Sequence, residues 1–305
     1  FEIEWVISAG AGSFYINAAV GPAYGMSRLI GVSDYARDLI EALSAEGIKV
    51  EQFHPEYAAG QLELSVAAES PVDAADTSVL VRSTIGAVGR RYGYRTSFSP
   101  KVEVDGVGNG GHVHLSAWRD GQNLMAGGNR PCGLTPDGEA FGAGILNRLP
   151  GLLALGAPSV ASYLRLVPSH WAGAYACWGL ENREAALRMI TGSAGSTDWA
   201  ANLEVKCVDL TANPYLLLAG LLAAGSAGVA GGARLPEPID MDPAALLPAE
   251  LQKRGIRRLP TNLRESTDAL AADSRLRDAL GSELVESVIA VRESEIEQFA
   301  EASAD

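Results

Sequence analysis

The chain has 305 residues, of which 47% are hydrophobic and 20% are charged, as in a globular protein. Its formal net charge of −13 argues against nucleic acid as the main partner, because a basic surface is what attracts a phosphate backbone. No apolar run reaches the roughly 20 residues that span a bilayer, so we expect no membrane partner and interpret the most apolar stretch, Tyr215 to Ala230, as a buried helix.

The first predicted element is a strand, Phe1 to Ile7, whose alternation places Glu2 and Glu4 on one face and apolar side chains on the other. Strands and long helices then follow without regular βαβ units, which indicates the α+β class. Because the chain begins inside a strand and not at a Met, with no signal peptide, we expect that an upstream segment is missing. The further predicted elements are a helix at 27–47 stopped by Gly47, two strands around a turn at 48–68, a helix at 73–93 capped by Asp73 or Asp76, strands at 95–104 and 111–118, a turn at 119–122, helices at 136–157 and 213–229, and a mostly helical tail at 245–303.

The cysteines give an expectation about the redox environment. Cys132, Cys177 and Cys207 match neither a disulfide framework nor the spacing of a zinc site. Cys177 and Cys207 lie among apolar residues, so we expect them to be reduced core thiols. That use of cysteine predicts a cytoplasmic protein.

A glycine-rich segment, Gly106 to Gly111, matches the GxGxxG pattern of dinucleotide-binding folds. In those folds a helix follows the glycines, and its N-terminus binds the pyrophosphate. Here residues 112–118 alternate polar and apolar and predict a strand. We therefore reject the Rossmann interpretation. The chain also lacks the lysine motif of a P-loop, so ATP, if it binds, does so without one.

Potential cation ligands gather on strand-like segments. Glu2 and Glu4 repel each other side by side, which favours either a solvated face or a cation between them. Carboxylates with imidazole suit Mg²⁺ or Mn²⁺, and such ions serve phosphoryl transfer. Spacing alone leaves two interpretations open, a metal-dependent phosphoryl-transfer site or a set of structural ion pairs. The other candidates are Glu56 and Glu63, which a turn at 58–61 would bring to one side, His112, His114 and Ser116 on one strand face, Glu204, and the phosphate-binding candidates Arg165, Arg183 and Arg188.

Eight ordered motifs extend over nearly the whole chain: Glu2-Ile-Glu4, His54-Pro-Glu56 through Gln61-Leu-Glu63, Pro100-Lys101, Gly108 through Ser116, Tyr163-Leu-Arg165-Leu-Val-Pro168, Asn182-Arg183 with Arg188, Glu204-Val-Lys206 and Asn213-Pro214-Tyr215. Together they resemble the catalytic domain of glutamine synthetase, type I-like. The resemblance implies that residues 1–305 form one such domain, with a curved antiparallel sheet, or half-barrel, lined by metal-binding carboxylates and packed with helices.

The resemblance also implies roles for single residues. Family chemistry transfers the γ-phosphate of ATP to the side chain of glutamate, and an amine then displaces phosphate from the γ-glutamyl phosphate. The implied cofactors are ATP and about two or three Mg²⁺ or Mn²⁺ ions in each site. The implied positions are Glu4, Glu56 and Glu63 on one metal; Glu2, His112 and Glu204 on another; Arg165 and the Gly108 loop at the substrate glutamate; Arg183 and Arg188 at the phosphate; and His114 and Ser116 beside the nucleotide.

Departures from the family pattern point to the amine. The family carries a glutamate that accepts a proton from ammonium six residues after the Arg-Leu-Val-Pro arginine, and here that position is Trp171. Lys206 replaces a glutamate-binding arginine, and Asn202 replaces an arginine on the nucleotide side. Trp171, with Tyr175 and Trp178 nearby, favours an apolar alkyl or aryl amine, whereas a polyamine would favour acidic residues. A packing role for Trp171 is the alternative.

We therefore predict a ligase that forms a γ-glutamyl amide from glutamate and an organic amine. The alternatives are a true glutamine synthetase that uses ammonium, a structural or regulatory relative without activity, and an enzyme with another acid substrate. The family resemblance further implies self-association into rings, with an upstream small domain of a neighbouring subunit completing the site.

Overall fold

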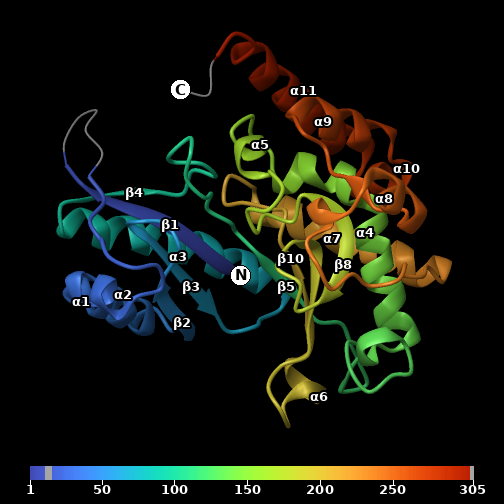
Figure 1. Ribbon diagram of the computed structural model, residues 1–305, viewed down its shortest axis with the longest axis horizontal. Helices are drawn as coiled ribbons and strands as arrows, with labels where there is room; N and C mark the ends of the chain where they lie inside the picture. The colour runs from blue at the N-terminus through green and yellow to red at the C-terminus, as the bar shows by residue number, and fades with distance from the viewer. Residues whose placement is uncertain (11–15, 303–305) are drawn as a thin grey trace. The chain divides into compact units, whose positions relative to one another are not determined.

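The computed structural model describes residues 1–10 and 16–302 and divides the chain into two compact units, Phe1–Gly111 and His112–Asp305 (Figure 1). Each unit has its own sheet and its own buried apolar side chains. That residues 1–305 act as one domain stays a prediction.

The first unit is built on a four-stranded antiparallel sheet in the order β2-β3-β1-β4. Ile3, Trp5 and Ile7 of β1 are fully buried, which confirms the apolar face predicted from their alternation. The indole Nε1 of Trp5 donates a hydrogen bond of 3.2 Å to the hydroxyl of Tyr35, so this face packs against α2. The elements are β1 (Glu2–Ala9), α1 (Met26–Gly31), α2 (Ser33–Ala45), β2 (Val50–Pro55), β3 (Gln61–Val66), α3 (Pro71–Arg91) and β4 (Tyr94–Ser97).

Two helix predictions for this unit are wrong in detail. The helix predicted at 27–47 is two helices, α1 and α2, because Val32 leaves helical geometry with φ −124° and ψ 21°. Neither Asp73 nor Asp76 caps α3. The cap position is Ser70, because Pro71 occupies the first helical position, where its missing N–H is not needed.

The strand predictions for this unit hold with one shortened strand. Residues 48–68 contain β2 and β3, and Gly60 in the turn between them has φ +74°. The strand predicted at 95–104 is β4, which ends at Ser97. The prediction of a strand is therefore wrong from Phe98 to Val104.

The second unit is built on a five-stranded sheet in the order β11-β8-β9-β10-β5, in which β8 and β9 run parallel and the other neighbours antiparallel. The helix α4 packs against α7 and against β8 and β9 (Figure 1). The α+β class with mainly antiparallel sheets is therefore confirmed, and so are the helices predicted at 136–157, at 213–229 and in the tail. The elements are β5 (Val113–Leu115), β6 (Trp118–Arg119), β7 (Gln122–Asn123), a 3₁₀ turn (Pro131–Gly133), α4 (Pro136–Gly156), α5 (Ser162–Arg165), β8 (Tyr175–Leu180), β9 (Ala185–Ile190), α6 (Thr197–Ala200), β10 (Asn202–Val205), α7 (Pro214–Gly231), a 3₁₀ turn (Pro243–Ala245), α8 (Pro248–Arg254), β11 (Arg257–Arg258), α9 (Leu263–Ala272), α10 (Ser274–Leu280) and α11 (Ser282–Gln298).

Helix α7 is long and apolar enough to cross a membrane by length and composition, and 44% of it is buried. Its glycines show close packing inside the unit. A Cβ on Gly228 would lie 2.1 Å from the carbonyl oxygen of Ala140, and one on Gly225 would lie 2.3 Å from the ring of Phe141. Both contacts are to α4, so one side of this helix is buried against α4, while other residues of the helix are exposed; the interpretation as a buried helix is correct for that side only.

Two smaller predictions, the rejection of a dinucleotide-binding fingerprint and the turn at 119–122, are also confirmed. Strand β5 begins at Val113, directly after the glycine-rich segment, so the helix that a dinucleotide fingerprint needs does not follow it. Asp120 and Gly121 between β6 and β7 have φ of 50° and 76°, as the central residues of a tight hairpin require.

Candidate active site

A first acidic cluster, formed by His54, Glu56 and Glu63, lies on the sheet of the first unit. Across β2 and β3, His54 pairs with Glu63, and Glu63 pairs in turn with Glu4 of β1. Nε2 of His54 lies 3.2 Å from Oε1 of Glu63, and its Nδ1 lies 3.5 Å from Oε1 of Glu56. These three side chains each offer a ligand atom within 4.8 Å of the others. The prediction that a turn returns Glu63 to the side of Glu56 is therefore confirmed.

Burial and mutual repulsion perturb this cluster. Burial, followed by the charges of neighbouring glutamates, raises the pKa of the Glu63 carboxyl to about 8. Burial and the charge of Glu4 raise the pKa of Glu56 in the same direction. The hydrogen bond to Glu63 raises the pKa of His54 to about 9, so the pair of His54 and Glu63 retains a proton at neutral pH. Carboxylates and imidazole on one side of a sheet are a donor set that fits Mg²⁺ or Mn²⁺.

His54 is a candidate ligand that the sequence reasoning did not assign. The signal was present in the His-x-Glu spacing at 54–56, but only the strand register shows that both carboxylates face this imidazole. The resemblance assigned Glu4 to the same metal instead, and that assignment stays a prediction.

Glu4 is held by the glycine-rich loop of its own unit. It is 8% exposed, and its Oε2 accepts hydrogen bonds from the amide of Gly110 at 2.7 Å and from Nε2 of Gln61 at 3.2 Å. The same Nε2 lies 3.0 Å from the carbonyl oxygen of Gly108. The side-chain amide of Gln61 therefore bonds both the carboxylate of Glu4 and the Gly108 loop, which is predicted to contact the substrate. Glu2 is half-buried and pairs with Ser65 along β1 and β3.

A second cluster surrounds Glu204 in the second unit. Strand register places Glu204 on β10 between Arg188 of β9 and His114 of β5. Its side chain is 1% exposed. Oε1 lies 3.0 Å from Nζ of Lys206 and 3.3 Å from Nδ1 of His112, and Oε2 lies 3.2 Å from Nη1 of Arg188. The predicted ligands His112 and Glu204 are thus adjacent, and the grouping of Glu2 with them stays a prediction.

The predicted substrate and phosphate arginines differ in their surroundings. Arg165 is 4% exposed, and its Nη2 donates to the carbonyl oxygen of Lys206 at 3.0 Å and lies 3.2 Å from Nε2 of His112. Arg188 also pairs with the exposed Glu181. Arg183 is exposed in the turn between β8 and β9. Arg165 and Arg188 therefore belong to the Glu204 cluster, whereas Arg183 lies outside these contacts.

The predicted nucleotide-side residues lie together. Nδ1 of His114 and Oδ1 of Asn202 are 2.9 Å apart. Ser116 is exposed just after β5, and its hydroxyl accepts a 2.9 Å hydrogen bond from the indole of Trp118. The pairing of β5 with β10 explains how residues distant in sequence meet here.

Trp171 lies in the loop between α5 and β8, and its two interpretations, an amine contact and a packing role on a loop, both stay predictions. It is 41% exposed, its φ is 56°, and its amide donates a 2.9 Å hydrogen bond to Oε1 of Glu184. The expectation that Trp178 contributes to an apolar amine site is wrong, because Trp178 is 1% exposed and its indole bonds the carbonyl of Pro236. Half-buried Tyr175 faces the guanidinium of Arg258.

Comparison with known proteins decides the family. The family model for the glutamine synthetase catalytic domain matches residues 12–305. The chain belongs to the glutamine synthetase family.

Relatives within the glutamine synthetase family differ in their named activities. Gamma-glutamylpolyamine synthetase GlnA3 of Streptomyces coelicolor is 59% identical over 95% of this chain and 63% of its own length. Type-1 glutamine synthetase 1 of Dictyostelium discoideum is 31% identical over 89% of this chain and 53% of its own length. The chain therefore spans between half and two thirds of these curated relatives.

Solved structures of the family have the same fold. A novel glutamine synthase homolog superposes with a TM-score of 0.84 at 35% identity, over 99% of this chain and 67% of that one. A complex of GmaS with ADP superposes with a TM-score of 0.87 at 28% identity, over 100% of this chain and 70% of that one.

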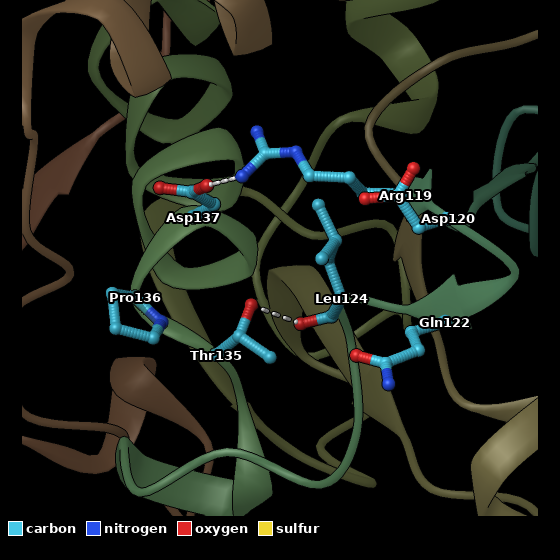
Figure 2. A pocket seen from close by; sticks show the side chains of 7 residues that line it. All are labelled: Arg119, Asp120, Gln122, Leu124, Thr135, Pro136 and Asp137. Atoms are coloured by element: carbon cyan, nitrogen blue, oxygen red, sulfur yellow. Dashed lines mark hydrogen bonds and ion pairs between the residues drawn. The ribbon is translucent and has the colours of Figure 1, made fainter.

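A pocket of about 300 Å³ lies elsewhere in the second unit, between the β6–β7 hairpin and the start of α4 (Figure 2). Arg119 and Asp137 form an ion pair across it, and Thr135 bonds the carbonyl of Leu124. None of the residues that line this pocket belongs to the Glu204 cluster, and none was predicted as a site residue.

The cysteines fit the expectation of reduced thiols. Cys132, Cys177 and Cys207 are free, and Cys177 and Cys207 are buried. Burial raises the pKa of both buried thiols to about 12, which keeps them protonated and unreactive.

Proposed function

We propose that the chain is the catalytic region of an ATP-dependent ligase that forms the γ-glutamyl amide of a polyamine. The observation that carries the proposal is the 59% identity to a protein named a gamma-glutamylpolyamine synthetase. Relatives named glutamine synthetases, such as those of Thermococcus kodakarensis and Methanosarcina mazei, are 35% and 29% identical. The proposal refines the predicted organic amine to one with several ammonium groups.

The surroundings of Trp171 support a polyamine over an apolar amine. The carboxylate of Glu184 contacts the amide of Trp171, and Asp242 accepts a 2.6 Å hydrogen bond from the hydroxyl of Ser169 in the same loop. Burial and the charge of Asp242 raise the pKa of Glu184. An exposed indole in a loop that two carboxylates bond suits an organic ammonium through cation–π attraction and charge. An ammonium ion has no alkyl chain to place on the indole.

The proposed reaction has two steps. The γ-carboxylate oxygen of glutamate attacks the terminal phosphorus of ATP, and ADP leaves. A neutral amine nitrogen then attacks the acyl carbon, phosphate leaves, and the nitrogen loses a proton. Divalent metal ions, when bound, hold phosphate oxygens and reduce the repulsion between the two anions.

The residue roles belong to the same proposal. The first cluster, with Glu4, would hold one divalent ion, and His112 with Glu204 would hold another. Arg165 and Lys206 would bind the glutamate, which also meets the Gly108 loop, and Arg183 and Arg188 would neutralise the transferring phosphoryl group. His114, Ser116 and Asn202 would contact the nucleotide. We further propose that the ion is Mg²⁺ or Mn²⁺, that the protein assembles into rings, and that it works in the cytoplasm.

An amine panel tests the proposal. The purified protein receives glutamate, Mg²⁺-ATP and one amine at a time, and ADP, phosphate and the mass of the amide are measured. We expect spermidine and putrescine to exceed ammonium, methylamine and an aniline by at least about tenfold in kcat/KM. Ammonium as the best substrate would make the protein a true glutamine synthetase. No ADP release with any amine in the panel would support an inactive relative, and replacement of glutamate by other amino acids tests the acid substrate.

A matched pair of variants tests the acidic amine site. Glu184→Gln should lower kcat/KM for spermidine more than for methylamine, because only the longer amine has a second ammonium group. Glu237→Gln, an exposed glutamate elsewhere in the unit, should change neither. Equal losses for both amines in Glu184→Gln would contradict this role.

A further inference from the structure

A buried arginine outside every sequence motif contacts the turn that carries Glu56. Arg28 is 5% exposed and is the buried residue of the short helix α1. Its Nη1 donates to the carbonyl oxygens of Glu56 at 2.6 Å, Tyr57 at 3.1 Å and Ala58 at 2.6 Å. Its Nε donates to the carbonyl oxygen of Gly21 at 2.9 Å. A guanidinium is always charged, so this cation is solvated by the backbone of the turn.

The inner side of the same turn is fixed by a second buried side chain. Oε1 of Gln61 accepts a 3.0 Å hydrogen bond from the amide of Ala58, and Gln61 also reaches Glu4. The backbone closes the turn, because the amide of Glu56 donates to the carbonyl of Gln61 at 2.9 Å. The carbonyl oxygens of three consecutive residues, 56–58, are therefore bonded by Arg28, and the amide of Ala58 is bonded by Gln61.

The position of the Glu56 carboxylate follows from these peptide units. Its Oε2 accepts a 3.0 Å hydrogen bond from the amide of Tyr57, and this amide belongs to the same peptide unit as the carbonyl of Glu56, which Arg28 binds at 2.6 Å. Rotation of that peptide would move both the carbonyl and the amide that orients the carboxylate. Side chains that orient metal ligands from outside commonly change metal affinity by about 10–100-fold when removed.

We propose that Arg28 is a positioning residue for the divalent-cation cluster of His54, Glu56 and Glu63. It fixes the carbonyls of residues 56–58 and thereby sets the direction of the Glu56 carboxylate. This inference rests on the proposed function only for the expectation that the cluster binds a divalent ion.

The test measures Mn²⁺ affinity by electron paramagnetic resonance of free Mn²⁺, so it does not depend on turnover. Arg28→Met should weaken Mn²⁺ binding about tenfold in the otherwise unchanged protein. It should have no further effect in a Glu56→Gln background, because the ligand that it orients is then absent. Arg37→Met, at an exposed arginine of α2, is the control and should leave binding unchanged. If Arg28→Met does not fold, Arg28→Lys, with fewer donors, should show a smaller loss.

Two results would overturn the inference. One is unchanged Mn²⁺ affinity in folded Arg28→Met or Arg28→Lys. The other is an equal loss in the presence and absence of Glu56→Gln, which would mean a general structural effect. A protein that binds Mn²⁺ but joins no amine to glutamate would refute the proposed function and leave this test intact.

Discussion

The neutral substitution Glu204→Gln tests the electrostatics of the second cluster most directly. It keeps the shape of the side chain and removes one buried negative charge. The carboxylate is 1% exposed and lies within 3.3 Å of groups on Lys206, His112 and Arg188. Lys206 is itself only 4% exposed, so after the substitution its ammonium is buried without a counter-charge on Glu204.

Removing one partner of a buried ion pair costs about 3–5 kcal/mol, because the other charge stays desolvated. We expect that loss in the free energy of unfolding for Glu204→Gln. Adding Lys206→Met should restore at least about 2 kcal/mol of it, since the double variant removes the stranded cation as well. Glu181→Gln is the matched control: it also loses a contact with Arg188, but Glu181 is exposed, and such surface pairs contribute below about 1 kcal/mol.

Urea unfolding followed by tryptophan fluorescence reports on this unit, because Trp118, Trp171, Trp178 and Trp199 all lie in it. A loss in Glu204→Gln no larger than that in Glu181→Gln would refute the reasoning. Mg²⁺ at about a hundred times its Kd should add about 2.7 kcal/mol of stability to the unchanged protein. Less of that gain should remain in Glu204→Gln if Glu204 is a ligand.

Other predictions concern the amine, the cation and the turn. Trp171→Glu should lower kcat/KM for spermidine at least about tenfold and raise the share of ammonium used, and an unchanged amine profile would argue against an amine contact. Metal binding requires the Glu63 carboxylate and the neutral imidazole of His54, whose pKa values are about 8 and about 9, so Mn²⁺ affinity should rise between about pH 6 and pH 9. Calorimetry in two buffers should show proton release, and binding without proton release at about pH 7 would contradict this. Gly60→Ala should cost more than the roughly 1–2 kcal/mol of left-handed strain, because its Cβ would lie 2.7 Å from the carbonyl oxygen of Ile7. Gly47→Ala, with φ +82° and open space around it, should show the strain alone, and equal urea midpoints for the two would be inconsistent with the contact.

Local patterns in the sequence were sufficient to predict most of the helices and strands. The alternation in β1 predicted which residues are buried, and the apolar runs predicted α4 and α7. The break at Val32 was missed although Gly31 precedes it and Ser33 and Asp34 follow it, because the periodicity of apolar residues continues across it. The cap of α3 was misplaced because Asp73 is a good cap by type, while Pro71 fixes the start of the helix earlier.

The site residues were harder to predict than the elements, because strand register and burial depend on the tertiary structure. His54 became a candidate ligand only once β2 and β3 were paired. Trp178 lies within a short run of aromatic residues near Trp171, but the alternation of β8 turns it into the core. Arg28 carries no motif at all, since its role depends on carbonyl oxygens, which every residue has.

Both clusters already offset the charge of their carboxylates, the first with a proton that His54 and Glu63 retain and the second with cationic side chains. His54 lies between Glu56 and Glu63, and Lys206 and Arg188 contact Glu204. In the proposed mechanism a divalent ion therefore displaces a bound proton from the first cluster. In the second cluster it displaces the ammonium of Lys206 and the guanidinium of Arg188 from Glu204. Exchange frees those groups to meet the anionic substrates, which would link cation binding to glutamate and phosphate binding. Lys206 is the group for which this matters most, because a compact ammonium moves between two anions more readily than a planar guanidinium held by several bonds.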